Sequence, residues 1–257
     1  DGWFLLGPLE GFGLLPDRSP LDLFFFQPLI HPDAPPEQGG LLPWWGSEGF
    51  RVHLFRPLSS LTHWLDHQLW GRWAFGHHLS SLALWGLLLA AVLGFFGELA
   101  TDSGRGTVAV VLAGLIFALD EAHGWDVGWI SNRNALVSVL FGVLSLRFYH
   151  RYRRSGGLRP LGLALACLLL GLCGGETAIG VVGWVVAWEV CMAQGTAASR
   201  IRAAAPMALL GLAYLVGWKL LGFGSQGSAL YVSPISEPVT FLTGALPQRL
   251  PVLLLGA

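Results

Sequence analysis

Long apolar runs separated by short polar connections fill the chain after residue 78. Because roughly 20 apolar residues cross a bilayer as a helix, the pattern predicts an all-α fold, a polytopic transmembrane helix bundle over residues 79–257. The expected spans are Leu79–Leu99, Thr107–Leu119, Val127–Phe148, Leu158–Cys173, Thr177–Met192 and Ala204–Leu221. A further run begins near Phe241, so we expect about six complete spans and a truncated seventh.

Residues 1–78 show a different pattern, because prolines and glycines interrupt them repeatedly. Leucines at helical spacing nevertheless predict one amphipathic helix in this segment, and such a helix is suited to lie on a membrane surface. These leucines are Leu58, Leu61, Leu65 and Leu69. We therefore expect residues 1–78 to form a large first loop that carries amphipathic interfacial helices.

Composition agrees with a membrane protein. Apolar residues make up 53% of the chain, charged residues make up 12%, and the mean hydropathy is +0.58. The net charge of −1 and the few, dispersed basic residues exclude a nucleic-acid partner. The chain begins without Met and ends within an apolar run, so we expect a fragment of a larger protein with spans missing at both ends.

Arginines orient the predicted spans. They gather in three alternate connections: Arg105 in one, Arg147, Arg151, Arg153, Arg154 and Arg159 in the next, and Arg200 and Arg202 in the third. Alternate connections share a side of the membrane, and excess arginine marks the cytoplasmic side. The large first loop and most acidic and histidine residues then lie on the extracytoplasmic side.

The segment Ala118–Leu136 is the most polar part of the predicted bundle. Asp120 and His123 are three positions apart, as are His123 and Asp126, so a helical turn would align these side chains on one face. There they could bind a divalent cation or orient an acceptor, since carboxylates and imidazole suit both tasks. The alternative is an ordinary solvated turn between helices.

Arg133 lies inside the apolar run that follows this segment. An unpaired arginine at membrane depth is costly, so the guanidinium needs an anion. A lipid phosphate is one such partner, and a structural ion pair with Asp126 or Glu176 is the other. Histidines earlier in the chain allow similar alternatives, because His63 and His67 could bind a metal or simply occupy a wet helix face.

Several motifs resemble those of GT-C integral membrane glycosyltransferases. The closest resemblance is to the transmembrane O-mannosyltransferases that carry tetratricopeptide repeats, and to their bacterial relatives. The motifs are RPLSSLTHWLDHQLWG at Arg56–Gly71, HHLSSLALW at His77–Trp85, IFALDEAHGWDVGWISNRNAL at Ile116–Leu136, LLLGLCGGETAIGVV at Leu168–Val182 and DGWFLL from Asp1. The chain departs from the family pattern at Trp85, Asp120-Glu121, Trp125 and Gly175.

The resemblance implies transfer of a sugar from a polyprenyl-phosphate donor to an acceptor glycan, lipid or protein. By this resemblance Asp1 is the candidate catalytic base, the last acid of a motif that opens the first loop. The acceptor hydroxyl needs a base and the lipid phosphate needs a cation, so carboxylates and arginines are the expected site residues. The further catalytic candidates are Asp126 and Asp120, and the substrate-binding candidates are Arg56, His123, Arg133 and Glu176.

A divalent metal ion is a possible cofactor of this chemistry, with Asp120, His123 and Asp126 as its candidate ligands. The expected location is the bacterial inner membrane, with the active site on the extracytoplasmic face and membrane lipid around the helices. Two other functions stay open on the sequence alone. They are a catalytically inactive GT-C-like scaffold, which the altered motif positions would suit, and a membrane transporter or lipid flippase.

Overall fold

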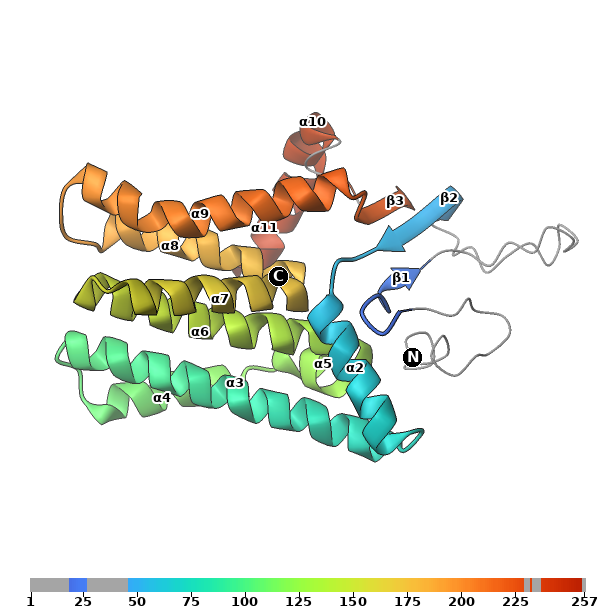
Figure 1. Cartoon of the computed structure of the whole chain (residues 1–257), viewed down its shortest axis with the longest axis horizontal. Coiled ribbons are helices and arrows are strands. Elements are labelled where there is room, and N and C mark those ends of the chain that lie inside the picture. Colours follow the sequence, from blue (N-terminus) through green and yellow to red (C-terminus); the bar gives the residue numbers. More distant parts are fainter. Residues whose placement is uncertain (1–18, 27–45, 229–231, 233–236, 256–257) are drawn as a thin grey trace, which may run out of the picture. The chain divides into compact units, whose positions relative to one another are not determined.

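The computed structural model is mainly helical (Figure 1). It describes residues 19–26, 46–228, 232 and 237–255. Contacts divide the chain into two compact units, one made of residues 1–24 and 54–222 and the other of residues 25–53 and 223–257. The predicted all-α class is confirmed, and a small sheet in the second unit is the one addition in the described residues.

Helices make up nearly all of the first unit. Their bounds are α2 (Pro57–Trp70), α3 (Ala74–Asp102), α4 (Thr107–Leu119), α5 (His123–Gly128), η3 (Ile130–Asn132), α6 (Arg133–Ser155), α7 (Leu158–Gly174), η4 (Glu176–Ile179), α8 (Gly180–Cys191) and α9 (Ala197–Leu220). The predicted amphipathic helix is thus present as α2. It belongs to the helical unit.

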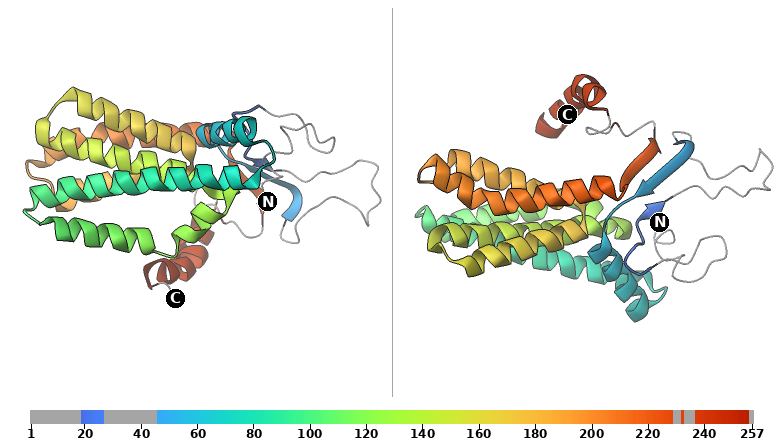
Figure 2. Two further views of the ribbon diagram at one scale, coloured as in Figure 1. Left: turned by 90° about the horizontal axis from the view of Figure 1, so that it is seen from below. Right: turned by 45° about the horizontal axis from the view of Figure 1, so that its top comes forward.

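The long helices of this unit run back and forth beside one another (Figures 1 and 2). The connections 103–106, 156–157 and 192–196 lie together at one end, which we call the arginine end. The opposite end, which we call the α2 end, holds α2, α5 and η4. The structure therefore gathers the arginine-bearing connections on one side of the unit, as the charge pattern predicts.

Two of the described helices, α3 and α9, are long and apolar enough to cross a bilayer, and α4 and α7 are shorter apolar helices. Only 28% of the apolar stretch of α3 and 17% of that of α9 is buried inside the molecule. On α4, Val108, Ile116 and Leu119 are each more than 70% exposed. The core helix of a water-soluble protein is mostly buried, so these helices carry apolar surface that the described chain leaves uncovered.

Two predicted spans differ from the structure. The run Val127–Phe148 is interrupted, because the backbone at Trp129 is extended and α6 begins only at Arg133. The run Thr177–Met192 opens with the 3-10 turn η4, which leaves α8 only 12 residues long. Gly128 precedes the first break and Gly175 precedes the second, and a count of apolar residues does not register either glycine as the end of a helix.

Small residues let α6 and α7 approach closely. A Cβ added at Gly174 would lie 2.9 Å from Val137 Cγ1 and 3.0 Å from Ser138 N, and one at Gly171 would lie 3.2 Å from Ser138 O. Ser138 Oγ then donates to Gly175 O and accepts from Ala178 N. Such contacts of small residues are the usual means of helix association in membranes.

Apolar side chains fill the space between these helices. One buried cluster joins α6, α7, α8 and α9 through Tyr149, Ala164, Leu168, Leu172, Ala178, Val181, Val185 and Met207. A second cluster joins α3 and α6 through Leu88, Ala91, Val92, Leu136 and Leu140. α6 belongs to both clusters, and its first residue is Arg133, so the packing of this helix fixes where that side chain lies.

The second unit contains an antiparallel sheet in the order β1-β2-β3. Its elements are β1 (Phe25–Phe26), β2 (Gly46–His53), β3 (Gly224–Ser228), α10 (Pro238–Thr240), the π-helix η5 (Phe241–Ala245) and α11 (Leu246–Leu255). The His53 ring lies between those of Phe25 and Phe223, with centroids 4.7 and 4.5 Å away. The predicted seventh run therefore begins as a π-turn followed by a helix.

Candidate functional site

Arg56 and Glu176 form an ion pair at the α2 end. Arg56 Nε donates to Glu176 Oε2 at 2.9 Å, and Nη2 lies at the same distance from that oxygen. The two side chains are 18% and 30% exposed, so solvent reaches both. The Arg56 guanidinium also lies 5.1 Å from the centre of the Phe24 ring. This is an arginine held in place by a carboxylate and an aromatic ring, yet open to a ligand.

Glu176 keeps one carboxylate oxygen uncommitted. Its Oε1 is buried and has no hydrogen-bond partner in the described part of the chain, and neither does the nearby Tyr214 Oη on α9. Unsatisfied buried polar atoms are few in native proteins, and each suggests a water or ligand contact. The surroundings of the Arg56–Glu176 pair thus offer both acceptors and donors.

Arg133 is fully buried, and its guanidinium contacts three partners within the protein. Its Nη1 lies 2.5 Å from Asp66 Oδ2, its Nε donates to Ser81 Oγ at 3.1 Å, and its Nη2 donates to His77 O at 2.7 Å. The Arg133 side chain is 0% exposed and that of Asp66 is 7% exposed. Its carboxylate partner is therefore Asp66, and the predicted pairing with Asp126 or Glu176 is wrong. The Arg133 side chain has no exposed surface, and its guanidinium contacts partners within the protein.

Two histidines complete this buried cluster. His77 Nε2 lies 2.9 Å from Gly71 O, and its Nδ1 lies 3.5 Å from Asp66 Oδ2. His63 is 1% exposed, and its Nε2 has no hydrogen-bond partner among the described residues. Burial, the nearby charge of Arg133 and then His77 lower the pKa of His63 to about 3. His63 is therefore neutral at pH 7, and Asp66 and Arg133 balance each other's charge.

The buried face of α2 is polar, and two of its four leucines are exposed. Ser59, Ser60, His63 and Asp66 are the buried residues of this helix, whereas Leu65 and Leu69 are 45% and 71% exposed. Ser59 Oγ donates to Gly174 O at 2.6 Å, which ties α2 to the end of α7. An amphipathic helix on a water-soluble protein has the opposite orientation.

Asp126 and Asn132 form a separate pair in the same region. Asn132 Nδ2 donates to Asp126 Oδ1 at 2.5 Å, across the break between α5 and α6. Burial raises the pKa of Asp126, and the neighbouring His123 opposes this shift. A carboxylate whose pKa is raised is better suited to accept a proton near neutral pH.

His123 and Asp126 lie three positions apart on α5, but Asp120 lies before this helix. Asp120 has an extended backbone at the end of α4, and its Oδ1 accepts from Ala122 N. The His123 ring packs against Trp85 and Phe117, with ring centres 4.5 and 4.6 Å apart. The predicted alignment therefore holds for His123 and Asp126 and is wrong for Asp120, because α5 begins only at His123. Asp120 is a turn-capping residue, and His123 is largely a packing residue.

No group of three or more histidine, cysteine, aspartate or glutamate side chains that could hold a metal ion occurs among the described residues. The residues named for a metal thus do not form such a site here. The remaining candidate, Asp1, lies outside the described residues. Asp66 is the important residue that sequence reasoning did not assign, although its spacing from Ser59 and His63 is that of one helical face.

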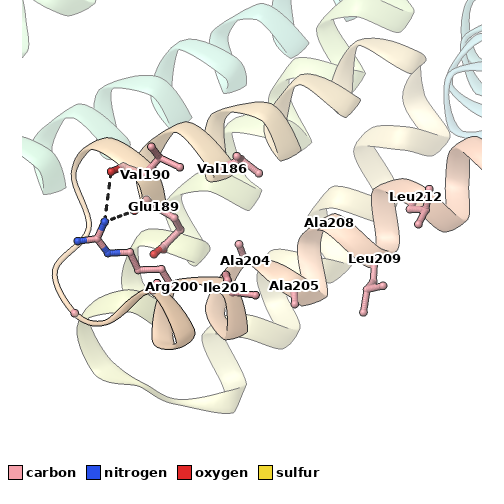
Figure 3. Close-up of a pocket in the computed structure, with 12 residues that line it drawn as sticks. Val186, Glu189, Val190, Arg200, Ile201, Ala204, Ala205, Ala208, Leu209 and Leu212 are labelled. Atoms are coloured by element: carbon pink, nitrogen blue, oxygen red, sulfur yellow. Dashed lines mark hydrogen bonds between the residues drawn. The ribbon is translucent and has the colours of Figure 1, made fainter.

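A cavity of about 750 Å³ lies elsewhere, between α8 and α9 at the arginine end (Figure 3). Its walls are mainly apolar, and Arg200 Nη1 donates to the carbonyl oxygens of Glu189 and Val190 at its rim. The Glu189 carboxylate is engaged by Tyr149 Oη and Arg153 Nε at 2.6 and 2.8 Å. Both charged residues of this cavity thus have partners within the protein, and the separate sequence motifs meet at the opposite end, so we place the candidate site at the α2 end.

No protein-family model, curated protein or solved structure matches the chain. Function therefore has to be inferred from the geometry of the α2 end and from the motifs that meet there. The polar contacts of this end join segments that are far apart in the sequence. Arg56 and Glu176 are 120 positions apart, and the hydrogen bond from Arg133 to Ser81 spans 52 positions.

Proposed function

We propose that this chain is part of an integral membrane glycosyltransferase of the GT-C type, which moves a sugar from a polyprenyl-phosphate donor to an acceptor. The observation that carries this proposal is the meeting of separate motifs at the α2 end. Arg56 and Asp66 come from the first motif, Ser81 from the second, Arg133 from the third and Glu176 from the fourth. These motifs resemble patterns of the family, and ion pairs or hydrogen bonds connect all four.

Membrane integration is the first part of the proposal. The helices α3, α4, α7 and α9 carry apolar surface that no described residue covers, and α2 presents leucines outward beside them. Lipid is the natural partner of such surface, and an interfacial helix has its apolar face toward the acyl chains. We propose a polytopic bundle with about six spans, in which α2 lies at the membrane interface.

Orientation follows from charge. Arginines lie at the connections of one end, whereas Asp120, Glu121, Asp126 and Glu176 belong to the other. Cytoplasmic connections are the arginine-rich ones, so the proposal puts the arginine end in the cytoplasm and the α2 end on the extracytoplasmic face. In a bacterium this membrane is the inner membrane.

The proposed chemistry assigns Arg56 to the donor phosphate. The Arg56 guanidinium is partly exposed at the start of α2, the proposed interfacial helix, and lipid phosphates are found at the depth of such a helix. Glu176 pairs with this guanidinium and positions it. Paired donors of this kind stabilise negative charge on a leaving phosphate. Asp126, with its raised pKa, is the proposed base within the described residues, and Asp1 is the base that the family resemblance implies.

The experiment measures sugar transfer by membranes that contain the complete protein. Three variants are tested: Arg56→Gln, Asp126→Asn and Asp1→Asn. The control variant is Glu121→Gln, because Glu121 is an exposed acid in the same turn as Asp120. We expect Glu121→Gln to be active and Arg56→Gln to lose at least tenfold in rate, because removal of one charge-stabilising donor costs about 100-fold in typical enzymes. Full activity of Arg56→Gln and of both aspartate variants would refute the proposed site.

A catalytically inactive scaffold of the same fold is the second candidate. One observation favours it: Arg133, a residue of the best-matching motif, is wholly used for structure. Binding of the donor lipid separates the two candidates. An enzyme binds it and turns it over, whereas a scaffold of intact fold shows neither turnover nor an Arg56-dependent affinity.

A further inference from the structure

A cavity of about 710 Å³ at the arginine end is lined by arginines. Its walls are formed by the last turns of α6 and the first turns of α7. The lining residues are Phe148, Arg151, Arg154, Ser155, Arg159, Pro160 and Leu163. The cavity thus combines guanidinium groups with an aromatic and aliphatic wall, which suits a ligand that has an anionic head and an apolar body.

The three arginines of the cavity differ in how far they are neutralised. Arg151 is held by Glu98, with Nη2 2.5 Å from Oε1, and Arg154 Nη1 lies 3.0 Å from Asp102 Oδ1. Arg159 has no ion pair or hydrogen bond of its side chain to any described residue and is exposed. One full positive charge therefore remains at the mouth of the cavity, beside the unused donors of Arg154.

The neighbouring acids already have other partners, because each contacts two basic side chains. Glu98 also accepts from Arg147 Nε at 2.6 Å, and Asp102 also lies 2.7 Å from His150 Nε2. Both carboxylates, Glu98 and Asp102, belong to α3. The cavity faces the α7 side, where the described lining contains no acid.

We propose that this cavity binds the phosphate of an anionic phospholipid head group, with Arg159 and Arg154 as its direct donors. A phosphate diester accepts from several guanidinium donors at once, and Phe148 and Leu163 provide the wall for the first carbons of the acyl chains. Basic pockets between helices on the cytoplasmic side of a membrane are suited to such lipids. The inference rests on the membrane placement in the proposed function, but it concerns the opposite end of the unit from the candidate transferase site.

The test uses the purified full chain in neutral detergent and follows its thermal unfolding as lipid is added. Phosphatidylglycerol is the probe, and phosphatidylcholine is the zwitterionic control. Sodium phosphate is the soluble control, and it is compared with a chloride solution of the same ionic strength. The variants are Arg159→Gln and the matched control Arg202→Gln, an exposed arginine at the start of α9 outside the cavity. Neither variant removes an ion pair of the described structure, so both should fold.

We expect saturable stabilisation by phosphatidylglycerol and little by phosphatidylcholine. Arg159→Gln should weaken the apparent affinity about fivefold, since one arginine near an anionic lipid contributes on this scale, whereas Arg202→Gln should keep it within about twofold. If sodium phosphate stabilises the protein, phosphatidylglycerol does not, and Arg159→Gln removes the effect, the cavity binds a soluble phosphate and not a lipid. Equal effects of the two variants, or of the two lipids, would overturn the proposal.

The same preparation separates this inference from the proposed function. Lipid binding is measured without a sugar donor, so it can succeed in a protein that transfers no sugar. A chain that carbonate washing removes from membranes would contradict the membrane placement. A chain that stays in the membrane but shows no Arg159-dependent binding would contradict the lipid site alone.

Discussion

Asp66 Oδ2 lies 2.5 Å from Arg133 Nη1, and this ion pair is almost completely buried between α2 and α6. Loss of one partner leaves the other charge buried and unpaired. We expect Asp66→Asn or Arg133→Gln to lower the free energy of unfolding by about 3–5 kcal/mol. Thermal or denaturant unfolding in detergent measures this loss, with Arg202→Gln as the control.

A double variant tests the coupling of these two residues. Because Asp66→Asn/Arg133→Gln removes both charges, its loss should be smaller than the sum of the single losses by at least about 1 kcal/mol. Additive losses would mean that the two side chains do not depend on each other, contrary to the geometry. The cycle is read from unfolding and requires no activity.

Acid should destabilise the protein through His63. The folded-state pKa is about 3, below the unfolded value of 6.5, so the unfolded state binds the proton more readily between these values. The stability contribution is complete above pH 6.5 and is lost as the pH falls toward 3, by about 1.4 kcal/mol for each pH unit. His63→Leu should flatten the dependence of unfolding on pH between 6.5 and 5. An unchanged slope would show that His63 is not buried in its neutral form.

Two glycines of α7 should respond oppositely to the same substitution. Gly174→Ala places a methyl group against Val137 and the backbone of Ser138, so we expect a loss of about 1–3 kcal/mol. Gly162→Ala meets open space within the same helix and should gain about 0.5–1 kcal/mol from the lower entropy of the unfolded chain. Equal effects on the unfolding temperature would contradict the close approach of α6 and α7.

Glu176→Gln should separate structure from function. The Arg56–Glu176 pair is partly exposed, so its loss should cost less than about 1 kcal/mol of stability. Sugar transfer should nevertheless fall at least tenfold, because Arg56 loses the carboxylate that positions it. A large loss of stability, with normal transfer by the folded fraction, would make the pair structural.

Asp126→Asn should leave the fold intact. Burial raises the folded-state pKa of Asp126, so ionisation is disfavoured in the folded protein, and the stability that Asp126 contributes decreases as the pH rises through its unfolded pKa. An asparagine cannot ionise and can still accept from Asn132. We therefore expect unchanged or slightly higher stability at pH 7. If Asp126 is the base, transfer by the wild type should rise with pH above the ordinary range for an aspartate, and the variant should lose this activity.

Local patterns predicted the helices well where the apolar runs were continuous. The spacing of Leu58, Leu61, Leu65 and Leu69 predicted α2, and the apolar runs predicted α3, α4, α7 and α9. The sheet was missed because β1 has two residues and β3 reads GSQGS, which has no alternating apolar pattern. The break before Arg133 was missed because Trp129 and Ile130 are apolar residues that fit a helix as well as a turn.

The helical class, the apolar surface and the arginine content of alternate connections could all be predicted from the amino-acid sequence, because each depends on residues that are close neighbours in the chain. The anion that neutralises Arg133 could not. The sequence suggested Asp126, seven positions away, or Glu176, 43 positions away, whereas the packing of α2 against α6 brings Asp66 from 67 positions away. The packing of α2 against the end of α7 likewise brings Arg56 to Glu176. Such pairings depend on how whole helices fit together in three dimensions, and no local pattern of polar and apolar residues records that fit.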